Sequence, residues 1–309
     1  MTSPASQFER TVAEHGALMR RVALAAVVTG IFLVAIKIVA FIITDSMAMM
    51  ASLSDSALDV IGSFVNLLAV RTALTPADRE HRFGHGKAEP LAGLAQGAFI
   101  AGSATFLVIE AIKRLLEPRP VENGFVGLVV MAVSIAAAVG LVVAQRIVVR
   151  RTGSIAINAD FMHYLGDIVV NLGVVVAIVL ATTVRLPAAD PIIGILVALL
   201  LAAGSWNVFR QSYNQLMDRE LPDADRERIK RIVMQNPAVR DMHDLRTRAA
   251  GVRAFIQVHI ELDPALSLMA AHAVSAAVEA GLNHAFPNAE VIIHQDPEGY
   301  EAVAALAKS

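Results

Sequence analysis

The chain has 309 residues, of which 56% are hydrophobic and only 17% are charged, and its mean hydropathy is +0.58. Soluble globular chains are about one-quarter charged, so this apolar excess predicts a protein that lies in a lipid bilayer. A formal net charge of −2 offers no electrostatic footprint for a nucleic-acid partner, and the absence of cysteine excludes disulfides, thiolate metal ligands and thiol catalysis.

Six long apolar stretches follow one another between residues 22 and 213. A helix that crosses a bilayer needs about 20 mostly apolar residues, and each stretch is long enough. Basic residues gather at every second end of these stretches, which the positive-inside rule places in the cytoplasm together with both chain termini. We predict transmembrane helices over residues 22–43, 47–73, 91–115, 123–149, 155–184 and 190–213.

The other residues divide into a cytoplasmic N-terminal segment, 1–21, and a cytoplasmic C-terminal domain, 214–309. Apolar and polar side chains alternate in FIQVHIEL, a pattern typical of a half-buried strand. The domain's elements are expected at 223–235, 242–248, 253–262, 268–286 and 290–295, in the order helix, strand, strand, helix, strand. The predicted fold class is therefore membrane all-α, a six-transmembrane-helix bundle followed by a small cytoplasmic α+β (αββαβ) domain.

Two pairs of ionisable residues interrupt the second and fifth apolar stretches. Asp55 and Asp59 are four residues apart, as are His163 and Asp167, so each pair lies on one face of its helix. An ionisable group at bilayer depth costs at least about 2.5 kcal/mol, which indicates a shared partner inside the bundle. Lys37 is the one basic residue well inside the first three predicted helices, so the carboxylates lack counter-ions without a metal or protons.

Three carboxylates and one imidazole fit the tetrahedral oxygen and nitrogen coordination of Zn²⁺. Because a metal ligand must be deprotonated, protons are expected to compete with the metal for these groups. Polar groups that only satisfy one another between packed helices are the alternative interpretation.

Further histidines and acidic residues form two groups outside the predicted spans. Between the second and third spans, Asp78, His81 and His85 are three and four residues apart, so a short helical turn could bring them together. A solvated polar loop is the alternative there. In the C-terminal domain a two-layer fold can gather several ligands at one end, whereas the alternative of surface histidines suits His15 and His284. The candidate ligands of that domain are His243, His259, His272, His294 and Asp296.

Short motifs spread over nearly the whole chain carry a family resemblance. They are SDSALDV at 54–60, ADREHRFGHGKAE at 77–89, HYLGD at 163–167, LMDRELPD at 216–223, HDLRTR at 243–248, FIQVH at 255–259 and VIIHQDP at 291–297. With these motifs in this order, the chain resembles the cation diffusion facilitator family, particularly its bacterial zinc and ferrous-iron efflux members.

The resemblance implies a secondary transporter, not an enzyme: a homodimeric, proton-coupled antiporter of the bacterial inner membrane that exports Zn²⁺, with Cd²⁺ and Fe²⁺ as further candidates. The family's transport site falls on Asp55, Asp59, His163 and Asp167, and its loop site on Asp78, His81 and His85. Its binuclear cytoplasmic site, where zinc is expected to stabilise the dimer and sense cytosolic metal, falls on His243, His259, His272, His294 and Asp296. An interlocking charge pair of the family falls on Lys87 and Asp218.

Three other functions stay open at this stage. An exporter selective for Fe²⁺ or Mn²⁺ would use similar ligands, although the quartet with a histidine resembles zinc-type and cadmium-type members more than manganese-type ones. A metal sensor or channel would need a site weak enough for rapid release. An intramembrane metalloenzyme would need an open coordination position and a general base, but the quartet uses every candidate group and the sequence has no H-E-x-x-H.

Overall fold

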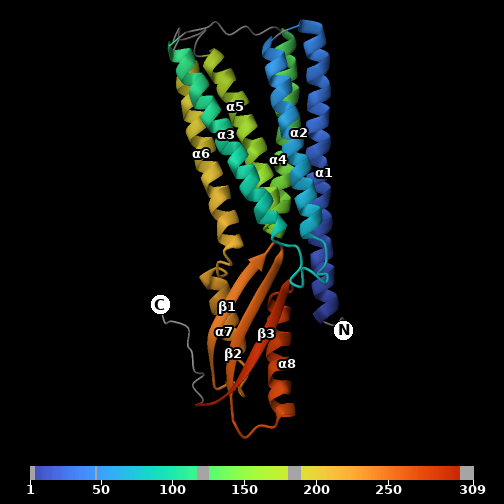
Figure 1. Cartoon of the computed structure of the whole chain (residues 1–309), viewed down its shortest axis with the longest axis vertical. Helices are drawn as coiled ribbons and strands as arrows, with labels where there is room; N and C mark the ends of the chain where they lie inside the picture. Colours follow the sequence, from blue (N-terminus) through green and yellow to red (C-terminus); the bar gives the residue numbers. More distant parts are fainter. Residues whose placement is uncertain (1–3, 46, 117–124, 180–188, 300–309) are drawn as a thin grey trace. The chain divides into compact units, whose positions relative to one another are not determined.

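The computed structural model describes residues 4–45, 47–116, 125–179 and 189–299. Two compact units make up the chain: residues 17–213, and residues 214–309 taken with the N-terminal 16 residues. Six long helices come first (Figure 1): α1 (Pro4–Thr44), α2 (Met47–Ala73), α3 (Ala88–Leu116), α4 (Phe125–Thr152), α5 (Ile155–Val179) and α6 (Ala189–Leu216). All six are long and apolar enough to cross a membrane, as the sequence predicts.

One helix extends well beyond its predicted span, and the ends of two other predicted spans cannot be compared with the structure. Helix α1 begins at Pro4, so described residues of the predicted N-terminal segment continue the first span as one helix. The segment contains several Ala, Arg and Glu residues, which favour helix, and this explains why the helix continues into the apolar stretch without a break. Residues 123–124 and 180–184 of the predicted spans lie outside the described residues.

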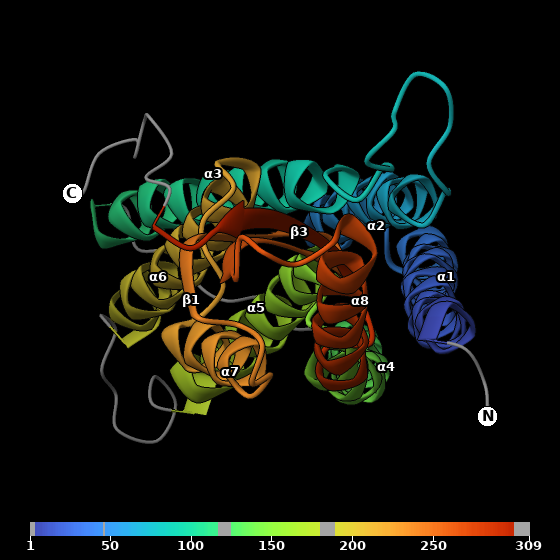
Figure 2. The ribbon, with the colours of Figure 1, turned by 90° about the horizontal axis from the view of Figure 1, so that it is seen from below.

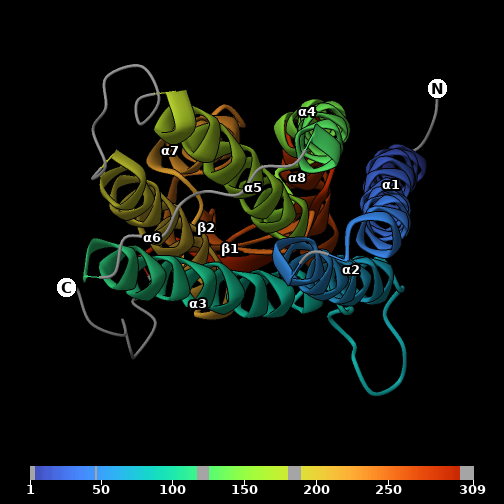
Figure 3. The ribbon, with the colours of Figure 1, turned by 90° about the horizontal axis from the view of Figure 1, so that it is seen from above.

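The membrane unit packs its helices through small residues and keeps large apolar side chains outside. Helix α5 packs against α3 and α4, and α2 packs against α3 and α5; Figure 3 shows the helices end-on. A Cβ at Gly93 of α3 would lie 2.8 Å from the Ile155 side chain of α5 and would collide with Ser212 of α6. Small residues let membrane helices approach closely. Phe106 and Leu200 are 68% and 64% exposed, as lipid-facing side chains would be.

The C-terminal unit is a three-stranded sheet with two helices on one face (Figure 2). Its elements are α7 (Asp223–Met234), β1 (Asp241–Ala250), β2 (Arg253–Leu262), α8 (Leu268–Ala285) and β3 (Ala289–Pro297). Strand β2 is central, antiparallel to β1 and parallel to β3. Alternate residues of β2, including Ile256 and Ile260, pack on Ile229 and Val233 of α7 and Leu282 of α8. The predicted αββαβ order is confirmed, and the opposite face of the sheet carries no helix within the described residues.

Candidate metal sites

Helices α2 and α5 bring three of the four predicted transport ligands together. Nε2 of His163 lies 3.0 Å from Oδ1 of Asp59 and 3.8 Å from Oδ2 of Asp167. One ligand atom from each residue lies within 4.8 Å of the others, a spacing that could hold a metal ion. His163 is buried, with the rings of Phe99 and Tyr164 meeting it edge-on at 5.5 and 5.4 Å. One imidazole and two carboxylates therefore converge inside the bundle, the donor types that Zn²⁺ prefers when thiolates are absent.

Asp55, the fourth predicted ligand, lies one turn before Asp59 on α2 but outside this group. Its side chain is exposed, whereas that of Asp59 is partly buried. Asp55 therefore shares a helix with Asp59 at a spacing of four residues, and its membership of the site stays a prediction.

A buried network that the sequence analysis did not predict lies behind the transport ligands. Asp160, one turn before His163 on α5, is fully buried, and its Oδ2 accepts a hydrogen bond from Nε2 of Gln145 at 2.7 Å. Its Oδ1 accepts a longer bond of 3.4 Å from the Ser63 hydroxyl. That hydroxyl lies 3.1 Å from the hydroxyl of Tyr164, which also bonds to the carbonyl of Ala26 at 3.3 Å.

This polar network joins α1, α2, α4 and α5, and so fixes the two helices that carry the predicted transport ligands. The sequence does contain a sign of this network, because Gln145 and Asp160 are polar residues within long apolar stretches. The contact between them could not be predicted from residue spacing, because they lie on two different helices.

A second buried carboxylate holds the start of α5. Glu89 lies in the first turn of α3 and is buried, and it accepts a hydrogen bond from the Ser154 hydroxyl. Ser154 immediately precedes α5 and in turn accepts from the backbone N–H of Ile157 at 3.3 Å, as an N-cap residue does. This bond links the beginning of α3 to the beginning of α5. His163 follows about two turns later along α5.

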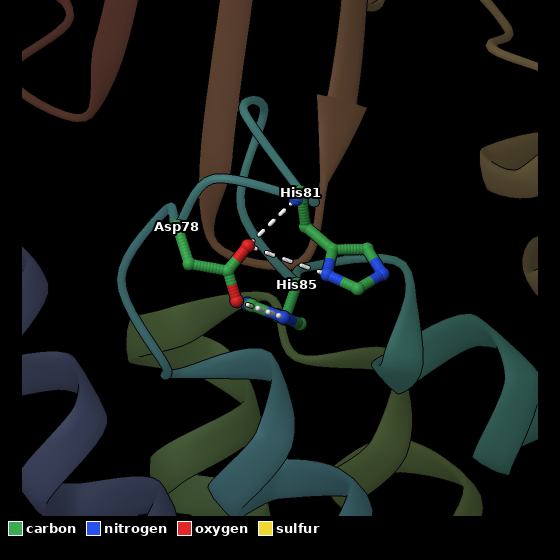
Figure 4. Close-up of side chains that lie close together, drawn as sticks. All are labelled: Asp78, His81 and His85. Carbon is green, nitrogen blue, oxygen red and sulfur yellow. Dashed lines mark hydrogen bonds and ion pairs between the residues drawn. The ribbon is translucent and has the colours of Figure 1, made fainter.

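The loop between α2 and α3 brings its three predicted ligands together (Figure 4). Oδ1 of Asp78 lies 3.4 Å from Nδ1 of His81, and its Oδ2 lies 3.5 Å from Nε2 of His85. The Asp78 carboxylate also accepts the backbone N–H groups of His81 at 2.6 Å and Glu80 at 2.9 Å. These two bonds, the one from His81 foremost, lower the pKa of Asp78. Gly84 completes the turn with a φ of 78°, a conformation that side chains rarely adopt.

On the helix-free face of the C-terminal sheet, strand register aligns three histidines in one row. His243 of β1 pairs with His259 of β2, which pairs with His294 of β3. Oδ2 of Asp296 lies 2.8 Å from Nδ1 of His259 and 3.3 Å from Nε2 of His243, while its Oδ1 lies 3.3 Å from Nε2 of His294. One carboxylate thus faces three imidazoles with both oxygens, and the ligand atoms of His243, His259 and Asp296 are close enough together to hold a metal ion.

His294 and the fifth predicted ligand, His272, which is exposed on α8, both lie outside the group of His243, His259 and Asp296 that could hold a metal ion, so their roles as ligands stay predictions. Asp244, which the sequence analysis did not select, has its Oδ2 3.9 Å from Nε2 of His259. It occupies an irregularity in the pairing of β1 and β2 and has a φ of 46°. Such a bulge re-aims a side chain, and the residue pattern of β1 contains no signal for it.

Two family models match this chain, and together they span almost all of it. The model described as the cation efflux transmembrane domain matches residues 22–217, and the one described as the cation efflux protein cytoplasmic domain matches residues 221–298. The chain belongs to the cation efflux family. The predicted resemblance is confirmed at this level, as are the multi-pass membrane fold and the prediction of a transporter instead of an enzyme.

Relatives in this family are similar over nearly their whole length. The cation-efflux pump FieF of Shewanella oneidensis is 44% identical over 273 residues, which cover 88% of this chain and 92% of the relative. The protein of the same name in Cronobacter sakazakii is 42% identical, covering 92% of this chain and 94% of the relative. A solved structure of CzrB, a candidate zinc transporter, covers 28% of this chain and 99% of its own at 32% identity, with a TM-score of 0.26 that is too low to establish a shared fold.

The predicted charge pair of this cation efflux protein, Lys87 and Asp218, joins residues of the two different units and stays a prediction. Within the C-terminal unit, Oδ1 of Asp218 lies 3.3 Å from Nη1 of Arg248. Asp218 has a φ of 52°, so its backbone turns sharply directly after α6.

Proposed function

We propose that this cation efflux protein exports Zn²⁺ from the cytoplasm across the inner membrane of a bacterium in exchange for protons. The observation that carries the proposal is the convergence of Asp59, His163 and Asp167 between α2 and α5. Zinc commonly takes four ligands from imidazoles and carboxylates in a tetrahedral site. Asp55, one turn away on the same face of α2, is proposed as the fourth.

Proton exchange follows from the chemistry of these ligands. A carboxylate or imidazole that holds a metal must be deprotonated, so protons that arrive from the outer side displace the ion and are carried inward on the emptied site. Each step uses the same side chains, and no second pathway is needed. Export then depends on the difference in pH across the membrane.

The two other metal sites are proposed to regulate transport. The sheet cluster around Asp296 would hold two zinc ions on an open face. The bound zinc would stabilise the contact between this face and a second copy of the chain. The short name of the family model that matches residues 221–298 contains the word dimer, which supports a homodimer. The loop site at Asp78, His81 and His85 would bind zinc close to the membrane surface, with both chain termini in the cytoplasm.

Uptake of Zn²⁺ by proteoliposomes with an imposed pH gradient tests the proposal. We expect saturable uptake that stops when the gradient is collapsed, and we expect Asp55→Ala and His163→Ala to abolish it. His284→Ala is the matched control, because this exposed histidine belongs to none of the three sites. His259→Ala is expected to leave residual flux.

The same vesicles decide among the alternative ions and functions. Uptake of Fe²⁺, Mn²⁺ and Cd²⁺ measured beside Zn²⁺ ranks the cargo directly. Zinc flux that is indifferent to the pH gradient would refute proton coupling. If His163→Ala transported zinc while His259→Ala did not, the assignment of the transport site would be wrong.

A further inference from the structure

Lys37 is a partly buried cation near the proposed transport site to which no role has been given above. It is the only basic residue between Arg21 and Arg71, a range that contains the apolar parts of α1 and α2. Its Nζ donates one hydrogen bond to the Ser56 hydroxyl at 2.6 Å and another to the Ser52 carbonyl at 3.2 Å. Both acceptors belong to α2, on the two sides of Asp55 in the sequence. The ammonium of α1 is therefore held at a defined place on the helix that carries two of the transport carboxylates.

The charges that act on this ammonium are those of the transport site. The carboxylates of Asp59, Asp167 and Asp55 all attract it. A lysine placed at bilayer depth without such a partner would be costly. Its hydrogen-bond acceptors are both uncharged, so the positive charge of Lys37 is not consumed by a private ion pair and acts on the site as a whole.

The charge balance of the site shows what this cation does. Three carboxylates carry three negative charges, and a metal-bound imidazole is neutral, so a divalent ion leaves the four ligands with one negative charge in excess. With Lys37 the empty ligands carry a net charge of −2 instead of −3, so they attract a divalent cation less strongly than they would without the lysine. Asp160 lies behind the site and accepts its own hydrogen bonds from Gln145 and Ser63. Its contribution to the net charge is the same whether or not Lys37 is present, so it does not change this comparison.

We propose that Lys37 tunes the affinity of the transport site, because its fixed ammonium weakens the binding of a divalent ion so that the ion can be released. Two charges of the same sign repel one another, and more strongly where less water lies between them. The lysine therefore raises the free energy of the bound cation and speeds its departure. This role rests on the proposed transport function and adds the residue that adjusts it.

Zinc uptake by proteoliposomes, measured as KM and kcat, tests this role with variants that separate charge from hydrogen bonding. Lys37→Gln keeps an N–H donor but removes the charge, and we expect its KM and its kcat both to fall at least about tenfold, because zinc binds more tightly and leaves more slowly. Lys37→Arg keeps the charge and should stay near the wild-type values. Ser56→Ala removes the 2.6 Å bond but not the charge, and it should change KM less than Lys37→Gln does.

Equilibrium dialysis of zinc against the detergent-solubilised protein gives a second measurement that does not depend on turnover. In a background with His81→Ala and His259→Ala, which weakens the other two metal sites, Lys37→Gln should lower the zinc Kd of the remaining site at least about tenfold. An unchanged Kd and KM in Lys37→Gln would overturn the role. Equal losses in Lys37→Gln and Lys37→Arg, with a raised Kd, would do so too, because they would indicate a purely structural contact. Absence of zinc flux in the wild-type protein would instead refute the proposed function.

Discussion

Replacement of Gln145 by leucine offers a direct test of the buried network behind the transport ligands. Asp160 is fully buried, and the Nε2 of Gln145 supplies the shorter of its two hydrogen bonds, 2.7 Å against 3.4 Å for the Ser63 hydroxyl. Removing one partner of a buried polar pair leaves the other unsatisfied, at a cost of about 1–3 kcal/mol and more when that group is charged. Oε1 of Gln145 is buried and has no hydrogen-bond partner among the described residues. Because leucine lacks this unsatisfied acceptor, its loss offsets part of the destabilisation.

We therefore expect Gln145→Leu to lower the free energy of unfolding by about 2 kcal/mol, and Ser63→Ala by about half as much. Unfolding in mixed micelles by increasing amounts of sodium dodecyl sulfate, followed by the loss of helical circular dichroism, gives both values. The second measurement is a double-mutant cycle with Asp160→Leu.

Replacing both members of a hydrogen-bonded pair with apolar side chains can be nearly neutral, so Gln145→Leu should cost little in the Asp160→Leu background. The reasoning fails if Gln145→Leu costs less than about 0.5 kcal/mol, below the net value of a single typical hydrogen bond. It fails equally if the cost is the same with and without Asp160, because the destabilisation would then come from packing alone.

Three further outcomes are expected. The pKa of Asp78 is lowered, so its stabilising bonds to the loop are complete above the ordinary Asp pKa of about 3.9 and are lost only as pH falls through the lowered value. Hydrogen exchange, corrected for its intrinsic rate, should therefore protect the amide of His81 equally at pH 7 and pH 5, and Asp78→Ala should remove the protection at both. Asp296→Ala removes the carboxylate that three imidazoles share, so the zinc stoichiometry measured by equilibrium dialysis should fall, with His284→Ala as the unaffected control. Ile260→Ala in the core of the C-terminal unit should cost about 3 kcal/mol, seen as faster hydrogen exchange of the β2 amides in the full chain, and unchanged exchange would contradict the described core.

Local patterns in the sequence were sufficient for the elements and for naming candidate ligands. Hydropathy reports whether a segment of about 20 residues prefers lipid, and it depends on no distant contact. The alternation of FIQVHIEL reports a half-buried strand in the same local way. Spacing of four residues placed His163 and Asp167 on one face of a helix, and in the structure both belong to the same group. The sequence analysis assigned no secondary structure to residues 1–21, and in the structure α1 already begins at Pro4.

The tertiary structure alone decided which residues meet. Spacing treats Asp55 and Asp59 alike, but the rotation of α2 against α5 puts Asp59 3.0 Å from His163 and leaves Asp55 outside the group. Strand register, set by burial of the opposite face, aligns His243, His259 and His294 in one row, while α8 carries His272 outside that row. Such contacts arise from the packing of whole elements, which depends on side chains far apart along the chain. For this reason the sequence could name the candidate ligands, and only the fold could assemble them into sites.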